Sequence, residues 1–280
     1  MAKPADARVF TIPAGTPFAA ALARGLIRRA EGEPLKLAEA TVFLPTRRAV
    51  RDFPEIFARE AGGAALLPDL RPLGDVDEDT ADIDPYTDDF VVPPPIAPLR
   101  RRLLLATMIR RWSENRAAPI SFGQAAGLAA GLAKVMDETE IAGADLSRLD
   151  DLAPADLAAH WAEVKDFLSL IRTEWPNLLA EEGAVNPAAA RNGALREAAR
   201  RLSTHPPAGP VIAAGSTGSI PATAELLVAI AHLSQGAVIL PGLDRNLDEE
   251  SWSRLDPGHP QYGMKRLLER MGLRREDVAV

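Results

Sequence analysis

The chain of 280 residues contains no cysteine. Disulfides, cysteine-bound zinc, iron–sulfur clusters and thiol nucleophiles are therefore excluded from it. It also lacks an apolar run long enough to span a membrane, and its first residues, MAKPADARVFTIPAG, do not resemble a secretory signal. We therefore expect a cytoplasmic protein without membrane contact.

Positive charge is in deficit, because 32 lysines and arginines face 39 aspartates and glutamates, for a net charge of -7. Proteins that coat nucleic acid are usually basic, so the balance argues against a strong stand-alone DNA binder and leaves room for a local basic groove. The proportions of apolar and charged residues, 47% and 25%, are typical of a globular protein with a substantial core.

Apolar stretches followed by helical spacing predict strand–turn–helix units. The stretches RVFTI at 8–12 and TVFL at 41–44 predict strands, and each precedes a helical pattern, the second bent or interrupted at Pro54. VIAAG at 211–215 and AVILPGL at 237–243 predict two more strands, separated by the helix PATAELLVAIAHL. Such alternation predicts parallel strands with crossover helices, hence an α/β fold. In ALLPDLRPLGDV, two prolines are expected to limit regular structure.

The middle of the chain is almost entirely helical in pattern. We expect helices over 97–115, 121–140, 154–182 and 187–203, and a final helix over 260–277. The predicted organisation is a first α/β part, a large all-helical insertion and a second α/β part. Their expected limits are residues 1–95, 96–204 and 205–280.

The turn after the first predicted strand stands where a phosphate-binding loop would lie. Gly15 and Thr16 are present, but Pro17 removes a backbone donor, Phe18 follows, and no lysine lies in the turn. Phosphoryl transfer needs those groups, so ATP hydrolysis is not expected. A simple strand-to-helix turn is the favoured interpretation, with no cofactor.

A second glycine-rich turn follows the strand at 211–215. Its hydroxyls, on Ser216, Thr217 and Ser219, and its backbone donors could bind an anion at a helix start, although a lysine is again absent. The alternative is a tight turn in which Ser219 caps a helix that begins at Pro221.

The sequence contains no clear motif for metal binding or for acid–base catalysis. The run at 75–89 holds eight acidic residues, and the spacing of its first aspartates is similar to that of a calcium loop. However, Thr80 and Tyr86 replace the glycine and glutamate that such a loop requires, so a solvated acidic loop is expected and no metal site. The four histidines lie far apart in sequence. A small-molecule enzyme would need a converging cluster, which the sequence does not show.

Arginines follow the second predicted strand at Arg47, Arg48 and Arg51. Ligands of open α/β sheets bind at the carboxyl ends of strands, so these side chains could contact phosphates, and a solvated helix face is the alternative. Further basic clusters at 100–102 and near the C-terminus are interpreted as solvated helix faces.

Several stretches, in the same order, resemble the start of AddB, a subunit of the bacterial AddAB double-strand-break repair helicase–nuclease. They include RVFTIPAGTPF, TVFLPTRRAVRDF, LLPDLRPLGDVDED, PPIAPLRRRLLLA, AEEGAVNPAAARN, PPAGPVIAAGSTGSIPATAELL, AVILPGLDRNLDEESW and HPQYGMKRLLERMG. The resemblance covers nearly the whole chain.

The resemblance implies a parallel-sheet, helicase-like domain of the P-loop NTPase type, similar to superfamily 1. It implies an inactivated motor whose degenerate nucleotide loop is Gly15–Phe18, an AddA-like helicase–nuclease subunit as partner, and DNA as ligand. TVFLPTRR matches the motif that touches single-stranded DNA in motor relatives, which makes Thr46, Arg47 and Arg48 the candidate contacts. In that family the nuclease lies far beyond this point, at the C-terminal end, so it is not expected within these 280 residues, and a chain without cysteine cannot bind the family's iron–sulfur cluster. A purely structural protein-interaction domain without DNA binding remains the alternative.

Overall fold

The computed structural model describes residues 7–73, 93–114, 119–144 and 158–280. The predicted acidic loop at 75–89 therefore lies outside the described residues. The chain divides into two compact units, one formed by Met1–Asp75 with Leu195–Val280 and the other by Val76–Ala194. The second division falls inside helix α7 (Pro187–Thr204), whereas the sequence placed the domain limit after that helix.

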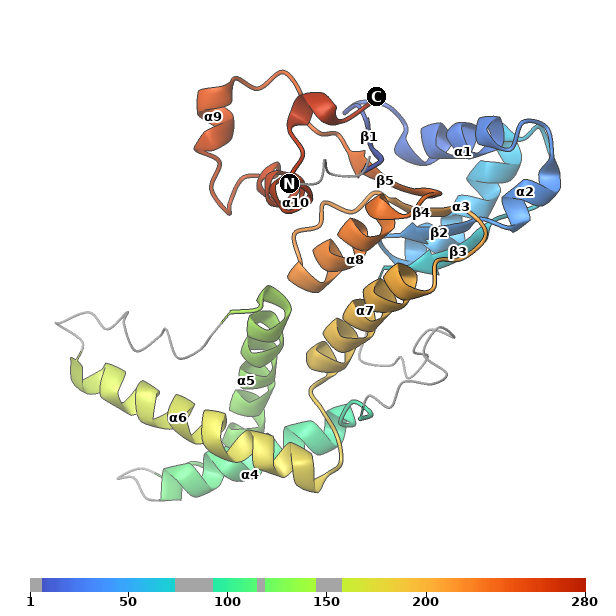
Figure 1. Cartoon of the computed structure of the whole chain (residues 1–280). Helices are drawn as coiled ribbons and strands as arrows, with labels where there is room; N and C mark the ends of the chain where they lie inside the picture. The colour runs from blue at the N-terminus through green and yellow to red at the C-terminus, as the bar shows by residue number, and fades with distance from the viewer. Residues whose placement is uncertain (1–6, 74–92, 115–118, 145–157) are drawn as a thin grey trace. The chain divides into compact units, whose positions relative to one another are not determined.

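The first unit is built on one parallel sheet of five strands in the order β1-β5-β4-β2-β3 (Figure 1). The strands are β1 (Val9–Ile12), β2 (Thr41–Leu44), β3 (Asp69–Pro72), β4 (Val211–Ala214) and β5 (Gly236–Pro241). The predicted α/β class with a parallel sheet is thus confirmed. All four predicted strands are present within a residue or two of the expected limits.

The fifth strand, β3, was not predicted, because Pro68 and Pro72 were expected to prevent regular structure. Proline is tolerated at a sheet edge when its missing donor faces away from the neighbouring strand. Here the donors that reach β2 come from the alternate residues, with Asp69 N 2.9 Å from Ala40 O and Leu73 N 2.7 Å from Leu44 O. Pro68 immediately precedes this edge strand and Pro72 ends it, so neither stands at a position whose backbone nitrogen donates to β2.

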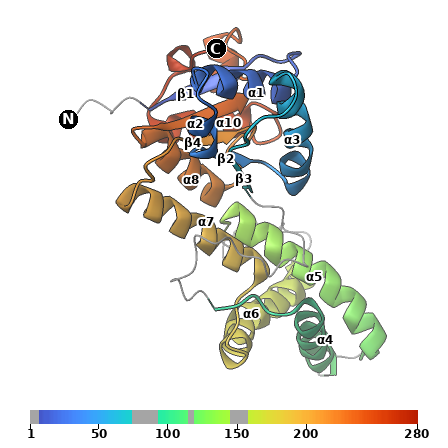
Figure 2. The ribbon, with the colours of Figure 1, turned by 90° about the vertical axis from the view of Figure 1, so that its right-hand side faces the viewer.

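Helices cover both faces of the sheet (Figure 2). One core joins α1 (Phe18–Arg29), α2 (Pro34–Ala38) and α3 (Arg47–Glu60) to one set of alternate strand residues, including Val42 and Ile212. The other core joins α8 (Pro221–His232), α10 (Tyr262–Met271) and the end of α7 to the opposite set, including Phe43 and Ala213. Burial on both faces explains why every residue of β2 and β4 is buried and why all of them except Thr41 are apolar.

Two helix predictions need correction. Helix α3 runs without interruption through Pro54, so the expected break does not occur there. The predicted last helix ends at Met271, because Gly272 adopts a left-handed conformation with φ 67° and terminates it. A short helix, α9 (Glu249–Ser253), precedes α10, and Ala279 then pairs with β1 through a 2.8 Å bond from Thr11 N to Ala279 O.

The second unit is helical, as the sequence predicted. It contains α4 (Pro98–Glu114), α5 (Phe122–Ala142), α6 (Ala158–Glu181) and the beginning of α7 (Pro187–Thr204). Its core includes Leu105, Ile109 and Trp175. The buried Arg101 guanidinium is paired with Asp137 at 2.7 Å, which joins α4 to α5.

Candidate nucleic-acid interface

The carboxyl ends of the parallel strands bring three predicted segments together. The segments are the turn after β1, the residues after β2 and the turn after β4. A β-carbon built on Gly215 would lie 3.0 Å from Pro45 Cγ and 3.3 Å from Phe18 Cε1, so the three segments meet at that glycine. The three segments lie about 30 to 200 residues apart in the sequence, so the sequence alone does not predict that they meet.

A change of winding direction occurs at the same place. Strands β2 and β4 are neighbours, but β2 leads into α3 on one face of the sheet while β4 leads into α8 on the other. Open α/β sheets bind ligands at such a switch point, outside the carboxyl ends of the strands. The geometry therefore marks this edge as the candidate site.

The arginines of α3 lie beside this switch point. Thr46 is the N-cap of the helix, and its hydroxyl oxygen accepts a 3.0 Å bond from Ala49 N. Arg47 is half-buried, whereas the Arg48 side chain is 88% exposed and only 3.6 Å from Asp52 in a solvated pair. Arg51 is also exposed. The hydroxyl of Thr46 thus has a local structural role, and the side chains of Arg48 and Arg51 are exposed to solvent.

Cations at this position oppose the helix dipole. The first turn of α3 holds no acidic residue and begins with two arginines, whereas the N-terminus of a helix carries partial positive charge. Each unfavourable charge costs about 0.3–1 kcal/mol at an exposed helix end. An anion bound at this end would remove that penalty.

The turn after β1 is tight and exposed. Thr16 N donates to Pro13 O at 3.2 Å, and Gly15 adopts φ 84°, which closes a four-residue turn. Pro17 is the N-cap of α1 and provides no side-chain cap, and Phe18 is half-buried near Gly215. The segment between β1 and α1 is thus a tight strand-to-helix turn.

The turn after β4 is packed against α10. A β-carbon on Gly218 would lie 2.9 Å from Leu267 Cδ2, and one on Gly263 would lie 3.1 Å from Ser219 Cβ. Gly218 N donates to Ser216 Oγ at 3.3 Å, so this hydroxyl stabilises the turn itself.

One expectation for this second turn is wrong. The cap of α8 is Ile220, without a side-chain bond, so Ser219 does not cap the helix, although Pro221 starts it as predicted. Ser219 is exposed, and Thr217 is half-buried.

The described part of the chain shows no cluster of side chains suited to metal binding. Residues 7–73, 93–114, 119–144 and 158–280 contain no group of three or more histidine or acidic side chains placed to hold a metal ion. The described histidines make separate local contacts, such as His232 Nδ1 with Val228 O at 2.8 Å. Within the same ranges, no helix is both long and apolar enough to cross a membrane.

The largest pKa displacement arises from ion pairing on α7. The guanidinium groups of Arg200 and Arg201 lower the pKa of Glu197 to about 2. Near the candidate edge, the pKa of Asp248 is lowered because its carboxylate caps α9 and accepts from Ser251 N at 2.8 Å. Both shifts have structural causes and neither indicates a catalytic acid.

Comparison with models of known protein families gives no match for this chain, and comparison with curated proteins gives none either. The class that the fold defines is an α/β protein with an all-parallel, doubly wound sheet.

Proposed function

We propose that this chain is a non-catalytic, helicase-like module of an AddB-like double-strand-break repair subunit. It would contact DNA at the carboxyl edge of the sheet and assemble with an AddA-type motor subunit. The collinear sequence resemblance and the parallel, doubly wound sheet support this proposal.

One observation carries the DNA-binding part of the proposal. Arg47 and Arg48 open a helix whose dipole disfavours cations, next to the switch point between β2 and β4. Functional sites are the places where such local rules are broken at the expense of stability. Guanidinium groups bind phosphate oxygens by charge-assisted bonds, so the ligand is a nucleic-acid backbone read without regard to sequence.

The non-catalytic part rests on the turn after β1. It has no lysine, Pro17 supplies no backbone donor, and the turn closes on itself through Thr16 and Pro13. A phosphate loop wraps the phosphates with consecutive backbone donors and a lysine. This chain would accordingly guide DNA while a partner subunit hydrolyses ATP.

The test is the affinity for single-stranded DNA of the variant with Arg47→Ala and Arg48→Ala. At low salt we expect about a tenfold or greater loss, because two phosphate contacts disappear. The matched control is Arg28→Ala with Arg29→Ala, which removes the same charge from exposed residues at the end of α1. Equal affinity of the two double variants would contradict the proposal.

A purely structural interaction domain is the second candidate. The net charge of -7 favours it, because an acidic chain is repelled by nucleic acid. Absence of salt-dependent DNA binding by the wild-type chain would favour this candidate.

A further inference from the structure

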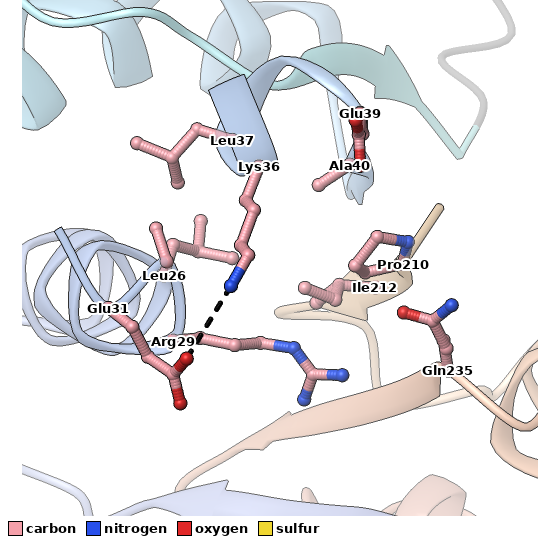
Figure 3. Close-up of a pocket in the computed structure, with 11 residues that line it drawn as sticks. Leu26, Arg29, Glu31, Lys36, Leu37, Glu39, Ala40, Pro210, Ile212 and Gln235 are labelled. Atoms are coloured by element: carbon pink, nitrogen blue, oxygen red, sulfur yellow. Dashed lines mark ion pairs between the residues drawn. The ribbon is translucent and has the colours of Figure 1, made fainter. Parts of the chain in front are cut away.

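A cavity of about 390 Å³ lies at the edge of the sheet opposite to the candidate DNA site. It is enclosed by the end of α1, by α2, and by residues that immediately precede or begin β2, β4 and β5 (Figure 3). Its volume falls in the range of small-molecule sites. It lies at the amino ends of the strands, whereas the candidate DNA site lies at their carboxyl ends, and none of its lining residues belongs to that site.

The floor of the cavity is apolar. Leu26, Leu37 and Ile212 are buried there, and the small side chains of Ala30 and Ala40 leave the space between helix and sheet unfilled. The hollow is open to solvent on one side, where Arg29, Glu31, Lys36 and Glu39 are exposed. An apolar group can be accommodated against the buried residues of its floor.

The rim carries charges of both signs, and one cation is available. Lys36 is engaged by Glu33 at 3.1 Å and by Glu31 at 3.5 Å, and its pKa is raised chiefly by the bond to Glu33. Glu31 adopts φ 52°, a conformation disfavoured for a residue with a side chain, and its carboxylate reaches toward Lys36 (Figure 3).

Arg29 differs from Lys36, because its guanidinium has no hydrogen-bond or ion-pair partner among the described residues. It extends into the cavity between Glu31 and Gln235 (Figure 3). Gln235 is fixed by a 2.8 Å bond from Nε2 to Ala208 O, which leaves its amide oxygen as an acceptor at the mouth.

We propose that this cavity binds a small organic monocarboxylate whose apolar body rests on Leu26, Leu37 and Ile212 and whose carboxylate pairs with Arg29. Arginine presents two parallel donors that match a carboxylate. Glu31 and Glu39 on the rim repel additional negative charge, so polyanions such as nucleic acid or inorganic phosphate are disfavoured.

The experiment uses the full chain with isotope-labelled methyl groups and benzoate as the probe. We expect saturable shifts of the Leu26, Leu37 and Ile212 methyl signals. Arg29→Gln should lower the affinity for benzoate about tenfold, because a charge-assisted bond is lost. For the same reason, the wild-type chain should bind the neutral benzamide about tenfold more weakly than benzoate. Arg28→Gln, a change at the neighbouring exposed arginine, should leave the affinity within about twofold, since Arg28 does not line the cavity.

The proposal would be overturned by shifts that do not saturate, by equal affinities for benzoate and benzamide, or by benzoate binding that survives Arg29→Gln unchanged. Inorganic phosphate that competes as well as benzoate would also contradict it, because the apolar floor would then have no role. Both arginines are exposed, so the variants are expected to fold, and circular dichroism checks this.

Discussion

At the scale of single residues, Arg275 is a buried cation that joins the end of the chain to the loop after β5. It is 7% exposed, donates to Leu247 O at 2.6 Å, pairs with Glu249 and lies 4.6 Å above the ring of Trp252. These contacts hold α9 and the preceding loop beside the final strand pairing. Position 275 therefore fixes a loop at the same edge of the sheet as the candidate site.

Replacing Arg275 by alanine should lower the free energy of unfolding by about 2 kcal/mol, because the half-buried carbonyl of Leu247 loses a charged donor and a packed side chain is removed. Urea denaturation measures this. Arg274→Ala is the matched control, since the adjacent side chain is 76% exposed and its ion pairs are solvated, and it should cost about 0.5 kcal/mol or less. Equal losses for the two variants would contradict the assigned role.

Glu197 is expected to control part of the acid sensitivity. Its pKa is lowered from 4.5 to about 2, first by Arg200 and then by Arg201, which lie 2.6 and 2.7 Å away. A lowered pKa in the folded state gives stability that is present above pH 4.5 and is lost as the pH falls toward 2. The melting temperature of Glu197→Gln should therefore fall less than that of the wild type between these pH values. Parallel profiles would contradict this.

At the scale of elements, α5 contains three glycines, Gly123, Gly127 and Gly131, on one exposed helical row. A β-carbon at any of them would meet nothing within 4 Å. Gly127→Ala and Gly131→Ala should each stabilise the chain by about 1 kcal/mol, because alanine restricts the unfolded backbone and favours helix. Thermal unfolding measures the change.

Gly143 provides the matched control for these changes. It ends α5 with φ 63°, a conformation that a side chain disfavours, so Gly143→Ala should destabilise by about 1 kcal/mol. Stabilisation at position 143, or destabilisation at positions 127 and 131, would show that the helix face or its end is assigned incorrectly.

The elements that sequence periodicity predicted well are those with strong local signals. Helix α5 has a long helical pattern and β2 is a short, mostly apolar stretch, so both were predicted within about two residues. Strand β3 was missed because its prolines are harmless only at a sheet edge, and edge position is a property of the whole sheet. The short helices α2 and α9 were missed because five residues carry too little periodicity.

At the scale of the whole molecule, the order of the strands could not be predicted from the sequence. The reason is that β1 pairs only with segments near the other end of the described chain, namely β5 and Ala279. The candidate site follows from that order. The sequence identified Arg47, Arg48 and the turn at Gly215, but their meeting around Pro45 and Phe18 depends on β2 and β4 being neighbours. The cavity around Arg29 was not foreseen, since its lining comes from four separate segments.

The purified chain should not release phosphate from ATP above the buffer background, with or without single-stranded DNA. The physical reason is the closed turn at Pro13–Thr16, which has no lysine to neutralise the transferred phosphate. A sensitive phosphate-release assay checks this. Hydrolysis that disappears in Gly15→Ala would contradict the inactive-motor proposal.

The most direct test of the central claim is the dependence of single-stranded DNA affinity on salt. Each phosphate contact contributes about 0.7 to the slope of log affinity against log salt on single strands. The account predicts a negative slope for the wild type, and a slope about 1.4 shallower for Arg47→Ala with Arg48→Ala. The Arg28→Ala with Arg29→Ala control should keep the wild-type slope. A wild-type affinity that is independent of salt, or an unchanged slope in the first double variant, would contradict the claim that the start of α3 binds the nucleic-acid backbone.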